Sequence, residues 1–575
     1  MKVAGRTTVF VLMIVAASCL FAARGLGHLG VEYRDDEIFY CRSTQEMLES
    51  HQWLSPTYFQ EDRFQKPILF YWFVLLAYAI GGVHWFSARM VSVVFAALTA
   101  GLCGLWAREV TRLRTAALSC LILMTFPLFF RHARNVVPDM SLTFFVTLAL
   151  FAGWKVLREE NAGVFRIVFF VACALGFMVK GFTAILVPGL TLFLSARWLK
   201  RKDLTARMNV PLGLLIMAVI ILPWFLYMRV THGAGYLLYM IAEETKDRIF
   251  VASSIGFIPQ LLKTFCAHVV FYAKVLTLYF APWSLLALVA WSTGGRRFLA
   301  EDTDREATVF FTIWIGIVFL FFSMISFKIS HYLLVLSVPL AIMTARILTA
   351  ALSAEKTLTS RLIKSLLTLL MVVSALVASF LFVYLGDLSS GWLWFYAAAA
   401  LGGGWVIVIS RHPVVPSAVL GTLVIVIFSQ TSALARAGIC PMTAYQKIAA
   451  IIEKNEESYP IAVASHDLHE KELQVYFDRK IEKTGHGYEL LTFRNLMAFS
   501  RKHPDAYCLI TGADYRKYAS KLEPFDYRVI HKERLFRKRL SLDGGFVTAL
   551  WRLDRAAIQK YLIEEILLLQ KDDHA

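Results

Sequence analysis

The stretch RHARNVVPDMSLTFFVTLALFAGW, residues 131–154, sets the pattern of the chain: a polar segment ends in an acid, Asp139, and an apolar run follows directly. Apolar runs of this kind recur along the sequence and are separated by short charged loops. The 575 residues are 58% hydrophobic and only 18% charged, which is too apolar for a soluble protein. The sequence therefore predicts a mainly α, polytopic membrane protein.

The lengths of the apolar runs predict about 13 transmembrane helices, because a helix needs roughly 20 residues to cross the hydrocarbon core. The first run, residues 9–22, resembles a signal peptide but is predicted to remain as an uncleaved span. The stretch Ile68–Ile80 is too short for a comfortable crossing, so we expect it to lie in the interface or to return on the same side. The other crossings are predicted at residues 86–107, 115–130, 140–154, 167–179, 182–195, 209–228, 267–291, 309–325, 333–348, 366–384, 391–409 and 418–434.

Lysine and arginine in the loops indicate the orientation, because cytoplasmic loops carry an excess of these residues. If Ile68–Ile80 does not cross, all the basic loops fall on the side of the N-terminus. The formal charge of +17 is then explained by anionic lipid headgroups rather than by nucleic acid. The opposite face receives segments 31–67, 131–139 and 229–266. The loops assigned to the cytoplasm contain Arg108, Arg112 and Arg114; Lys155 and Arg158; Arg197 to Arg207; Arg296 and Arg297; and Lys356, Arg361 and Lys364.

Two acids on that outer face are candidates for catalysis. Asp36 lies in the acidic cluster Glu32–Glu37 after the first span, and Asp139 stands at the mouth of a later span. Each has an ordinary alternative explanation, a solvated loop charge for Asp36 and a helix N-cap for Asp139. Together at one membrane surface they can form a shared site, where a carboxylate deprotonates or orients an attacking acceptor oxygen.

Four cations from separate segments reach the same face: Lys66, Lys180, Arg248 and Lys328. Near the ends of spans such side chains often only extend to the interface, which is the alternative for each of them alone. Positive charge is otherwise scarce on this face, so the four together indicate an anionic ligand such as a phosphate. Cations also stabilise the phosphate that leaves when a glycosyl phosphate bond breaks. The aromatic stretch Phe64–Trp72 is expected to line an isoprenoid groove.

Motifs around these residues resemble those of the superfamily C glycosyltransferases, specifically the group of aminoarabinose (lipid A) transferases and protein O-mannosyltransferases. The resemblance implies a polyprenyl-phosphate-sugar-dependent glycosyltransferase of the bacterial inner membrane with its active site on the periplasmic side. It covers roughly residues 8–350. The matching segments are Asp36-Glu37 with Tyr40, Phe64–Trp72, Ala133–Met140, Lys180-Gly181, Asp247–Phe250 and Ser326–Tyr332.

The resemblance also assigns roles to single residues. Lipid A or lipopolysaccharide is the implied acceptor, and a protein hydroxyl is the alternative. The implied site residues are Asp36 and Asp139 as catalytic acids; Lys66, Lys180, Arg248, Lys328 and Tyr332 for the carrier phosphate; and Glu37, Tyr40, Tyr71 and Arg134 as substrate-lining residues.

Three positions depart from the pattern of the group. Gln65 stands where a Glu is usual, and Thr245 or a neighbour stands where a His is common. Those two family residues can bind a divalent metal, so this sequence does not supply the usual ligand set. Phe39 replaces a common Arg, and the identity of the sugar therefore does not transfer from the family.

Two function classes other than an enzyme also suit a multi-span protein. A transporter or flippase of lipid-linked sugars would place its polar residues near the bilayer midplane on paired repeats, and no internal repeat is visible in this sequence. A non-catalytic scaffold leaves the acids and cations on one face without an explanation. The enzyme is the preferred interpretation.

The C-terminal region changes character, which divides the chain into a transmembrane core, residues 1–437, and a small extracytoplasmic α/β domain, residues 438–575. This domain is expected to help recruit the acceptor or only to cap the membrane core. A disulfide between Cys440 and Cys508 is a possibility that the spacing leaves open. Strands are predicted at Ile461–Ala464, Leu473–Phe477, Cys508–Thr511 and Phe546–Leu550.

Overall fold

A computed structural model gives the architecture of the chain, which folds into two compact units. The first contains Met1–Arg24, Ser43–Ala375 and Ala397–Ile427, and the second contains Gly25–Arg42, Leu376–Tyr396 and Phe428–Ala575. The domain boundary predicted at residue 437 stays a prediction. The structure describes residues 2–26, 36–159, 162–201, 203–233, 235–236, 257–295, 304–325, 327–354, 357–385, 389, 391–430, 441–454, 461–465, 468, 482–483, 496, 499, 501–503, 506–523, 527–536, 545, 548–549, 552 and 554–571.

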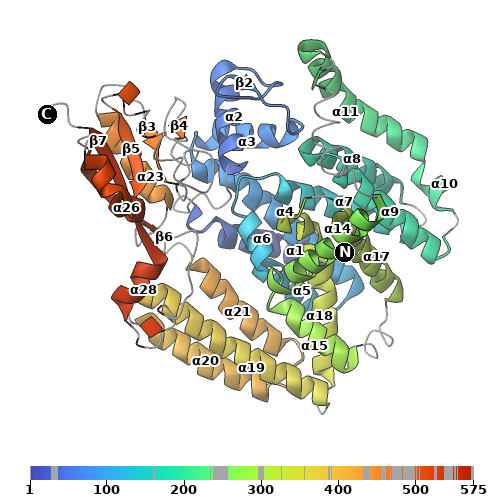
Figure 1. Ribbon diagram of the computed structural model, residues 1–575. Helices are drawn as coiled ribbons and strands as arrows, with labels where there is room; N and C mark the ends of the chain where they lie inside the picture. The colour runs from blue at the N-terminus through green and yellow to red at the C-terminus, as the bar shows by residue number, and fades with distance from the viewer. Residues whose placement is uncertain are drawn as a thin grey trace. The chain divides into compact units, whose positions relative to one another are not determined.

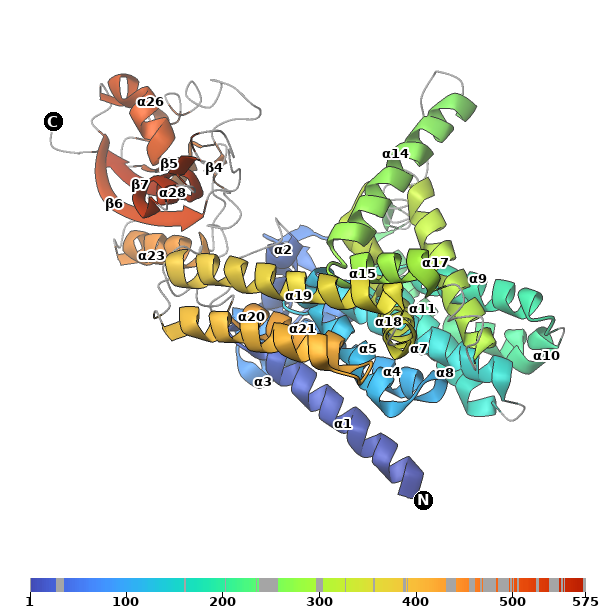
Figure 2. The same ribbon diagram turned by 90° about the horizontal axis from the view of Figure 1, so that it is seen from below.

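Within these residues, nine helices are long and apolar enough to cross a membrane, and a bent helix pair gives a tenth span (Figures 1 and 2). The prediction of a helical multi-pass membrane protein is therefore confirmed. The spans are α1 (Lys2–Ala23), α4 (Trp85–Val110), α7 (Asp139–Arg158), α8 (Gly163–Lys180), α10 (Leu204–Met208) with α11 (Val210–His232), α17 (Arg305–Met324), η4 (Ser330–Leu336) with α18 (Ser337–Ser353), α19 (Leu358–Ala378) with η5 (Ser379–Leu385), α20 (Gly391–Ile409), and the bent pair α14 (Phe257–Leu278) and α15 (Trp283–Ala290).

Four apolar helices are shorter. Three of them, α5 (Leu113–Thr125), α9 (Thr183–Trp198) and α21 (Val415–Ser429), lie where crossings are predicted, and a full crossing there stays a prediction. The fourth, α3 (Leu69–Gly81), has 13 residues and coincides with the stretch that is not expected to cross.

Helices α7 and α8 are neighbours in the chain and pack against one another (Figure 1). Two glycines permit this close approach. A Cβ on Gly153 of α7 would lie 3.3 Å from the Phe169 ring, and one on Gly176 of α8 would lie 3.2 Å from Cβ of Phe145. Gly181 ends α8 with φ +101°, a backbone conformation that L side chains rarely adopt, and so allows the immediate turn into α9.

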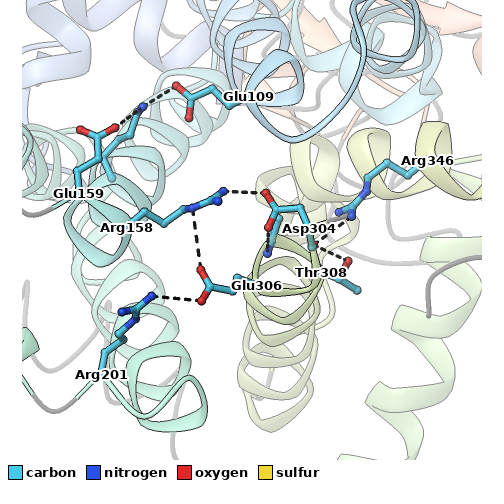
Figure 3. Close-up of polar contacts among 10 residues, drawn as sticks. Glu109, Arg158, Glu159, Arg201, Asp304, Glu306, Thr308 and Arg346 are labelled. Atoms are coloured by element: carbon cyan, nitrogen blue, oxygen red, sulfur yellow. Dashed lines mark hydrogen bonds and ion pairs between the residues drawn. The ribbon is translucent and has the colours of Figure 1, made fainter. Parts of the chain in front are cut away.

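An ion-pair network joins the ends of several helices in the first unit (Figure 3). Arg158 at the end of α7 lies 2.7 Å from Asp304, and Arg201, after α9, lies 3.3 Å from Glu306 of α17. Arg346 of α18 donates to the Asp304 carbonyl at 3.2 Å. Because α7 rises about 1.5 Å per residue, this network lies about 28 Å along the helix axis from the first residue of α7.

A small hairpin precedes α3. Its strands β1 (Thr57–Tyr58) and β2 (Glu61–Asp62) pair antiparallel, and the turn between them has positive φ at Phe59 and Gln60. The carboxylate of Glu46, in α2 (Asp36–Ser50), accepts hydrogen bonds from the backbone N–H groups of both turn residues, at 2.8 and 3.2 Å. The chain leading to Lys66 is therefore fixed at one end by a buried acid.

The C-terminal part of the second unit is an α/β domain, as predicted. Its five strands have the order β4-β3-β5-β7-β6, with parallel pairs among β4, β3 and β5 and antiparallel pairs to β7 and β6. Alternate residues of β3, β5 and β7 form two cores, one with α23 and one with α26, so the sheet carries a helix on each face. The bounds are β3 (Ile461–Val463), β4 (Glu482–Lys483), β5 (Tyr507–Thr511), β6 (Tyr527–Phe536), β7 (Ile563–Lys571), α23 (Pro441–Lys454), α26 (Gly512–Leu522) and α28 (Arg555–Leu562).

Of the four predicted strands, two are confirmed, one is wrong and one lies outside the described residues. Those at Ile461–Ala464 and Cys508–Thr511 are β3 and β5. The strand predicted at Phe546–Leu550 is wrong, because its described residues Thr548 and Ala549 are helical. The prediction for Leu473–Phe477 falls outside the described residues, as does Cys440. Cys508 carries a free thiol in the structure, which does not support a disulfide to Cys440.

Candidate active site

A cavity of about 670 Å³ lies in the first unit, among the ends of helices that are far apart in the sequence. Asp139 comes from the start of α7, Lys180 from the end of α8, and Arg229 from the last turn of α11. The other polar lining residues are Gln65, Lys66, Thr143, Thr183, His331 and Tyr332, and the apolar ones are Pro67, Leu142, Phe177, Phe182, Leu186, Ile221, Leu222, Phe225, Leu226, Phe321, Phe322, Ile325 and Val335.

The lining changes from polar to apolar along α11 and α8. On α11, Arg229 is followed towards the middle of the span by Phe225 and Ile221, which lies about 12 Å from Arg229 along the axis. Lys180 likewise ends α8, and Phe177 lies one turn deeper in that helix. The cavity therefore has charged groups at the helix ends and apolar groups further along the same helices, which suits an amphiphilic ligand.

Asp139 and Lys180 form an ion pair inside this cavity. Nζ of Lys180 lies 2.5 Å from Oδ1 of Asp139, and the side chains are only 13% and 8% exposed. The acid starts its helix and the base ends its helix, so both charges are also favoured by the helix dipoles. The packing of α7 on α8 thus places the carboxylate and the ammonium together.

Two histidines extend this pair. Nε2 of His331 lies 3.7 Å from the same Asp139 oxygen, and its ring centroid is 5.5 Å from that of His132. His132 ends α6 (Pro127–His132), and its Nδ1 lies 2.8 Å from the Leu128 carbonyl, which accepts its proton. Burial lowers the pKa of His132 to about 4, so this ring is neutral at physiological pH.

Tyr332 also lies near Lys180. The Lys180 ammonium is 5.9 Å from the centre of the Tyr332 ring, and that ring stacks on Phe322 at 4.6 Å. Lys66 enters the cavity from the loop before α3, and Arg63 in the same loop donates to the Tyr71 hydroxyl at 3.0 Å. The structure therefore brings together four of the predicted site residues: Lys66, Asp139, Lys180 and Tyr332.

Other predicted residues lie elsewhere. Tyr71 is buried beside Arg63, and Arg134 donates to the Arg24 carbonyl at 2.8 Å and lies over the Phe130 ring. Neither lines this cavity, so a substrate-lining role for either stays a prediction. Lys328 is exposed and does not line it. Arg248 falls outside the described residues.

Asp36, Glu37 and Tyr40 belong to the second compact unit. Asp36 is exposed at the first position of α2, whereas Glu37 and Tyr40 are buried. A carboxylate in the first turn of a helix is favoured by the helix dipole, which explains the position of Asp36 without assigning it a reaction.

Sequence reasoning missed Arg229 and His331 as site residues. His331 adjoins Tyr332 in one of the motifs, and Arg229 lies in the last turn of a helix that ends on the predicted outer face. The motif position of His331 and the helix-end position of Arg229 could have identified them. A single basic residue at the end of a span, however, usually only extends to the membrane interface.

A divalent metal does not fit this cavity as far as the chain is described. Across the described ranges, no group of three His, Cys, Asp or Glu side chains is close enough to hold a metal ion. At the cavity, Gln65 supplies an amide, and the Asp139 carboxylate is already paired with Lys180.

Comparison with known proteins supports the resemblance. Residues 7–242 match the family model described as dolichyl-phosphate-mannose-protein mannosyltransferase. An uncharacterised protein of Aquifex aeolicus is 29% identical over 337 residues, which are 58% of this chain and 63% of that protein. An undecaprenyl phosphate-alpha-4-amino-4-deoxy-L-arabinose arabinosyl transferase of Pseudomonas fluorescens is 30% identical over 330 residues, 56% of each chain. The matched part of the chain thus spans less than two thirds of the length of these curated relatives.

The structural comparison covers nearly the whole chain. The crystal structure of ArnT from Cupriavidus metallidurans bound to undecaprenyl phosphate matches 98% of both chains with a TM-score of 0.68 at 17% identity. The chain has the fold of that transferase, and the resemblance inferred from the motifs is confirmed.

Proposed function

We propose that the protein is an integral membrane glycosyltransferase that moves a sugar from a polyprenyl-phosphate carrier to an acceptor of the bacterial envelope. The observation that carries this proposal is the cavity, whose lining combines the cations Lys66, Lys180 and Arg229 with a largely apolar wall. A polyprenyl phosphate has the same division into an anionic head and an apolar tail. Cations bind the phosphate and aromatic and aliphatic side chains contact the isoprenoid.

The size of the cavity supports the same ligand. Its volume of about 670 Å³ falls within the range of pockets that bind small ligands. The headgroup, the sugar and the first isoprene units occupy it in this proposal, and the rest of the tail lies in the bilayer. The P. fluorescens relative is named for undecaprenyl phosphate, and the C. metallidurans protein was crystallised bound to it, which agrees with this carrier class.

The chemistry follows from the charges. The acceptor oxygen attacks the anomeric carbon, the bond from that carbon to the phosphate oxygen breaks, and the carrier phosphate leaves as an anion. Lys66 and Tyr332, with Arg248 and Lys328 as further candidates, stabilise the leaving phosphate. Asp36 and Asp139 are the proposed catalytic acids, with Asp36 deprotonating or orienting the acceptor. The carrier phosphate is itself the leaving group, so no nucleotide is needed.

The active site is proposed to face the periplasm. The distribution of basic loops supports this orientation, because Arg158 and Arg201 of the ion-pair network lie at the ends opposite Asp139 and would face the cytoplasm (Figure 3). The C-terminal α/β domain then lies on the periplasmic side, where an envelope acceptor is available.

Lipid A or another part of lipopolysaccharide is the proposed acceptor. An aminoarabinose transferase is among the relatives, and the chain has the same fold as ArnT. Protein hydroxyls are the second candidate acceptor. The family model over residues 7–242, which describes protein mannosyltransferases, favours this candidate specifically.

One experiment tests the function and separates the two acceptors. Lipid A, other envelope glycans and envelope glycopeptides are compared by mass spectrometry between a deletion strain and its parent, each grown with and without a plasmid copy of the wild-type protein. Loss of one glycosyl unit from lipid A, restored by the plasmid, supports the lipid acceptor, and loss from Ser or Thr peptides supports the protein acceptor. Identical profiles in all strains would count against the transferase.

A further inference from the structure

His232, the last residue of α11, joins this helix to the hairpin that precedes α3. Its Nε2 lies 2.5 Å from Oγ of Ser55, and its Nδ1 lies 3.3 Å from Oδ2 of Asp62 in β2. A neutral ring with its proton on Nδ1 satisfies both contacts, because Nδ1 then donates to the carboxylate and Nε2 accepts from the hydroxyl. One side chain therefore connects two points of the hairpin region to the end of α11.

The ring of His232 also packs on the segment that leads to Lys66. Phe64 lies two residues before Lys66, and its ring centroid is 4.9 Å from that of His232 in an edge-on arrangement. The Phe64 ring makes a second edge-on contact, at 5.1 Å, with the ring of Tyr236. The backbone before Lys66 is therefore held by side chains at and just beyond the end of α11.

The same turn of α11 carries a cation of the cavity. Arg229 lies three residues before His232, and it lines the cavity together with Lys66. Residues three apart are neighbours on a helix surface. The contacts of His232 thus link Lys66 to Arg229, although the two cations come from segments far apart in the sequence.

We propose that His232 is a positioning residue of the carrier site, which sets the spacing at which Lys66 and Arg229 contact one carrier phosphate. The inference rests on the proposed function and adds His232 to it, with Ser55 and Asp62 as its partners. Two cations on separate segments bind one anion best when their spacing is fixed before the ligand arrives, because ordering them on binding costs free energy.

The contacts of His232 are those of a nucleophilic serine triad, in which the serine lies at Nε2 and the acid at Nδ1. Ser55, however, is only 7% exposed, and none of these three residues lines the cavity. Oγ of Ser55 also lies 3.9 Å from Sδ of Met228, a fully buried side chain of α11. The arrangement therefore suits a link between two segments rather than attack on a substrate.

Burial decides which contact of His232 contributes more. The Asp62 side chain is 49% exposed, so solvent weakens its interaction with the ring. Ser55 is buried, and removal of the imidazole leaves its hydroxyl without this partner, which is the more costly loss. We therefore expect Ser55→Ala to weaken carrier binding more than Asp62→Asn.

The test is a double-mutant cycle that is read out by carrier binding. Dissociation constants for a polyprenyl phosphate are measured with the full-length protein in lipid nanodiscs for the wild type, His232→Phe, Lys66→Ala and the two changes combined. Phe keeps a ring to pack on Phe64 and removes both nitrogens. His412→Phe is the matched control, because His412 contacts Arg114 and does not line the cavity.

His232→Phe should weaken binding about tenfold in the wild-type background and less than about twofold in the Lys66→Ala background, because His232 acts through Lys66. His412→Phe should bind like the wild type. An equal loss in both backgrounds identifies a general structural role and overturns the inference, as does an unchanged affinity of His232→Phe.

Thermal unfolding checks that each variant is folded, and Ser55→Ala replaces His232→Phe in the cycle if the latter does not fold. If the wild type binds the carrier and Lys66→Ala binds it equally well, the positioning role fails while the proposed function stands. A wild type that binds no polyprenyl phosphate contradicts the proposed function itself, and this inference with it.

Discussion

The ammonium of Lys180 lies 2.5 Å from the carboxylate of Asp139, joining the last residue of α8 to the first residue of α7. This contact is formed by two residues 41 positions apart in the chain and lies in the wall of the cavity of about 670 Å³. Asp139 and Lys180 therefore stabilise the packing of α7 on α8 and are also the residues proposed to act on the substrate.

Substitutions in the Asp139–Lys180 pair are expected to affect protein stability and transfer activity differently. Asp139→Asn leaves the Lys180 ammonium largely buried without its partner, and the protein should lose about 3 kcal/mol of stability. Replacing both residues, Asp139→Asn with Lys180→Met, should recover most of this loss because no unpaired charge remains. Both variants should lose transfer activity. Thermal unfolding in detergent and a transfer assay check these outcomes, and a double variant as unstable as the single one would contradict the account.

Lys66 is predicted to contact the carrier phosphate. Lys66→Ala should weaken binding of a polyprenyl phosphate by about 10- to 100-fold, the usual loss for a hydrogen bond to a charged group. Lys364→Ala is the matched control, since Lys364 donates to the Ser410 carbonyl at 2.6 Å and does not line the cavity. Equal affinities of the two variants, measured with the purified proteins, would remove Lys66 from the binding site.

Much of the fold could be predicted because lipid restricts what an apolar run can form. Asp139, Lys180 and Tyr332 could also be placed on one face by following the crossings, and the cavity brings them together. The choice of partner could not be predicted: the sequence assigns Lys180 to phosphate, whereas α7–α8 packing puts its ammonium on Asp139.

In the C-terminal domain, the secondary structure of some segments could not be predicted from the sequence pattern. The apolar run Phe546–Leu550 does not distinguish a buried strand from a helix by its periodicity, and its described residues are helical. Strand β6 was missed because Arg528, Lys532 and Arg534 give it the composition of a solvated segment. It is an edge strand, where exposed charged side chains are common.

The proposed topology predicts which positions are accessible from outside the cell. In a Cys266→Ala background, Gln60→Cys and Lys517→Cys should react with a membrane-impermeant maleimide in spheroplasts, whereas Lys200→Cys should react only after permeabilisation. All three native side chains are exposed: Gln60 lies in the hairpin turn, Lys200 follows α9, and Lys517 lies within α26. Labelling of Lys200→Cys in intact spheroplasts would reverse or refute the orientation.

Cys508 gives a prediction for the α/β domain. Its thiol is buried in β5, and burial raises its pKa to about 12, so almost no thiolate exists at neutral pH. Iodoacetamide at about pH 8 should leave it unmodified in the folded protein and alkylate it after unfolding without reductant. Peptide mass spectrometry reads out both states. If alkylation after unfolding requires a reductant, Cys508 is in a disulfide, and Cys440 becomes the partner to test.

Turnover by the Asp36→Asn variant tests the central claim of carrier-dependent glycosyl transfer most directly. The purified wild type and the variant are incubated with polyprenyl-phosphate-linked aminoarabinose and lipid A, and the release of polyprenyl phosphate and the gain of one glycosyl unit on lipid A are followed together by mass spectrometry. The account predicts that both products appear at equal rates with the wild type and that Asp36→Asn lowers both by roughly two to four orders of magnitude while carrier binding barely changes. Equal rates for the variant and the wild type, or no transfer by the wild type to lipid A or to any Ser- or Thr-containing peptide acceptor, would contradict it.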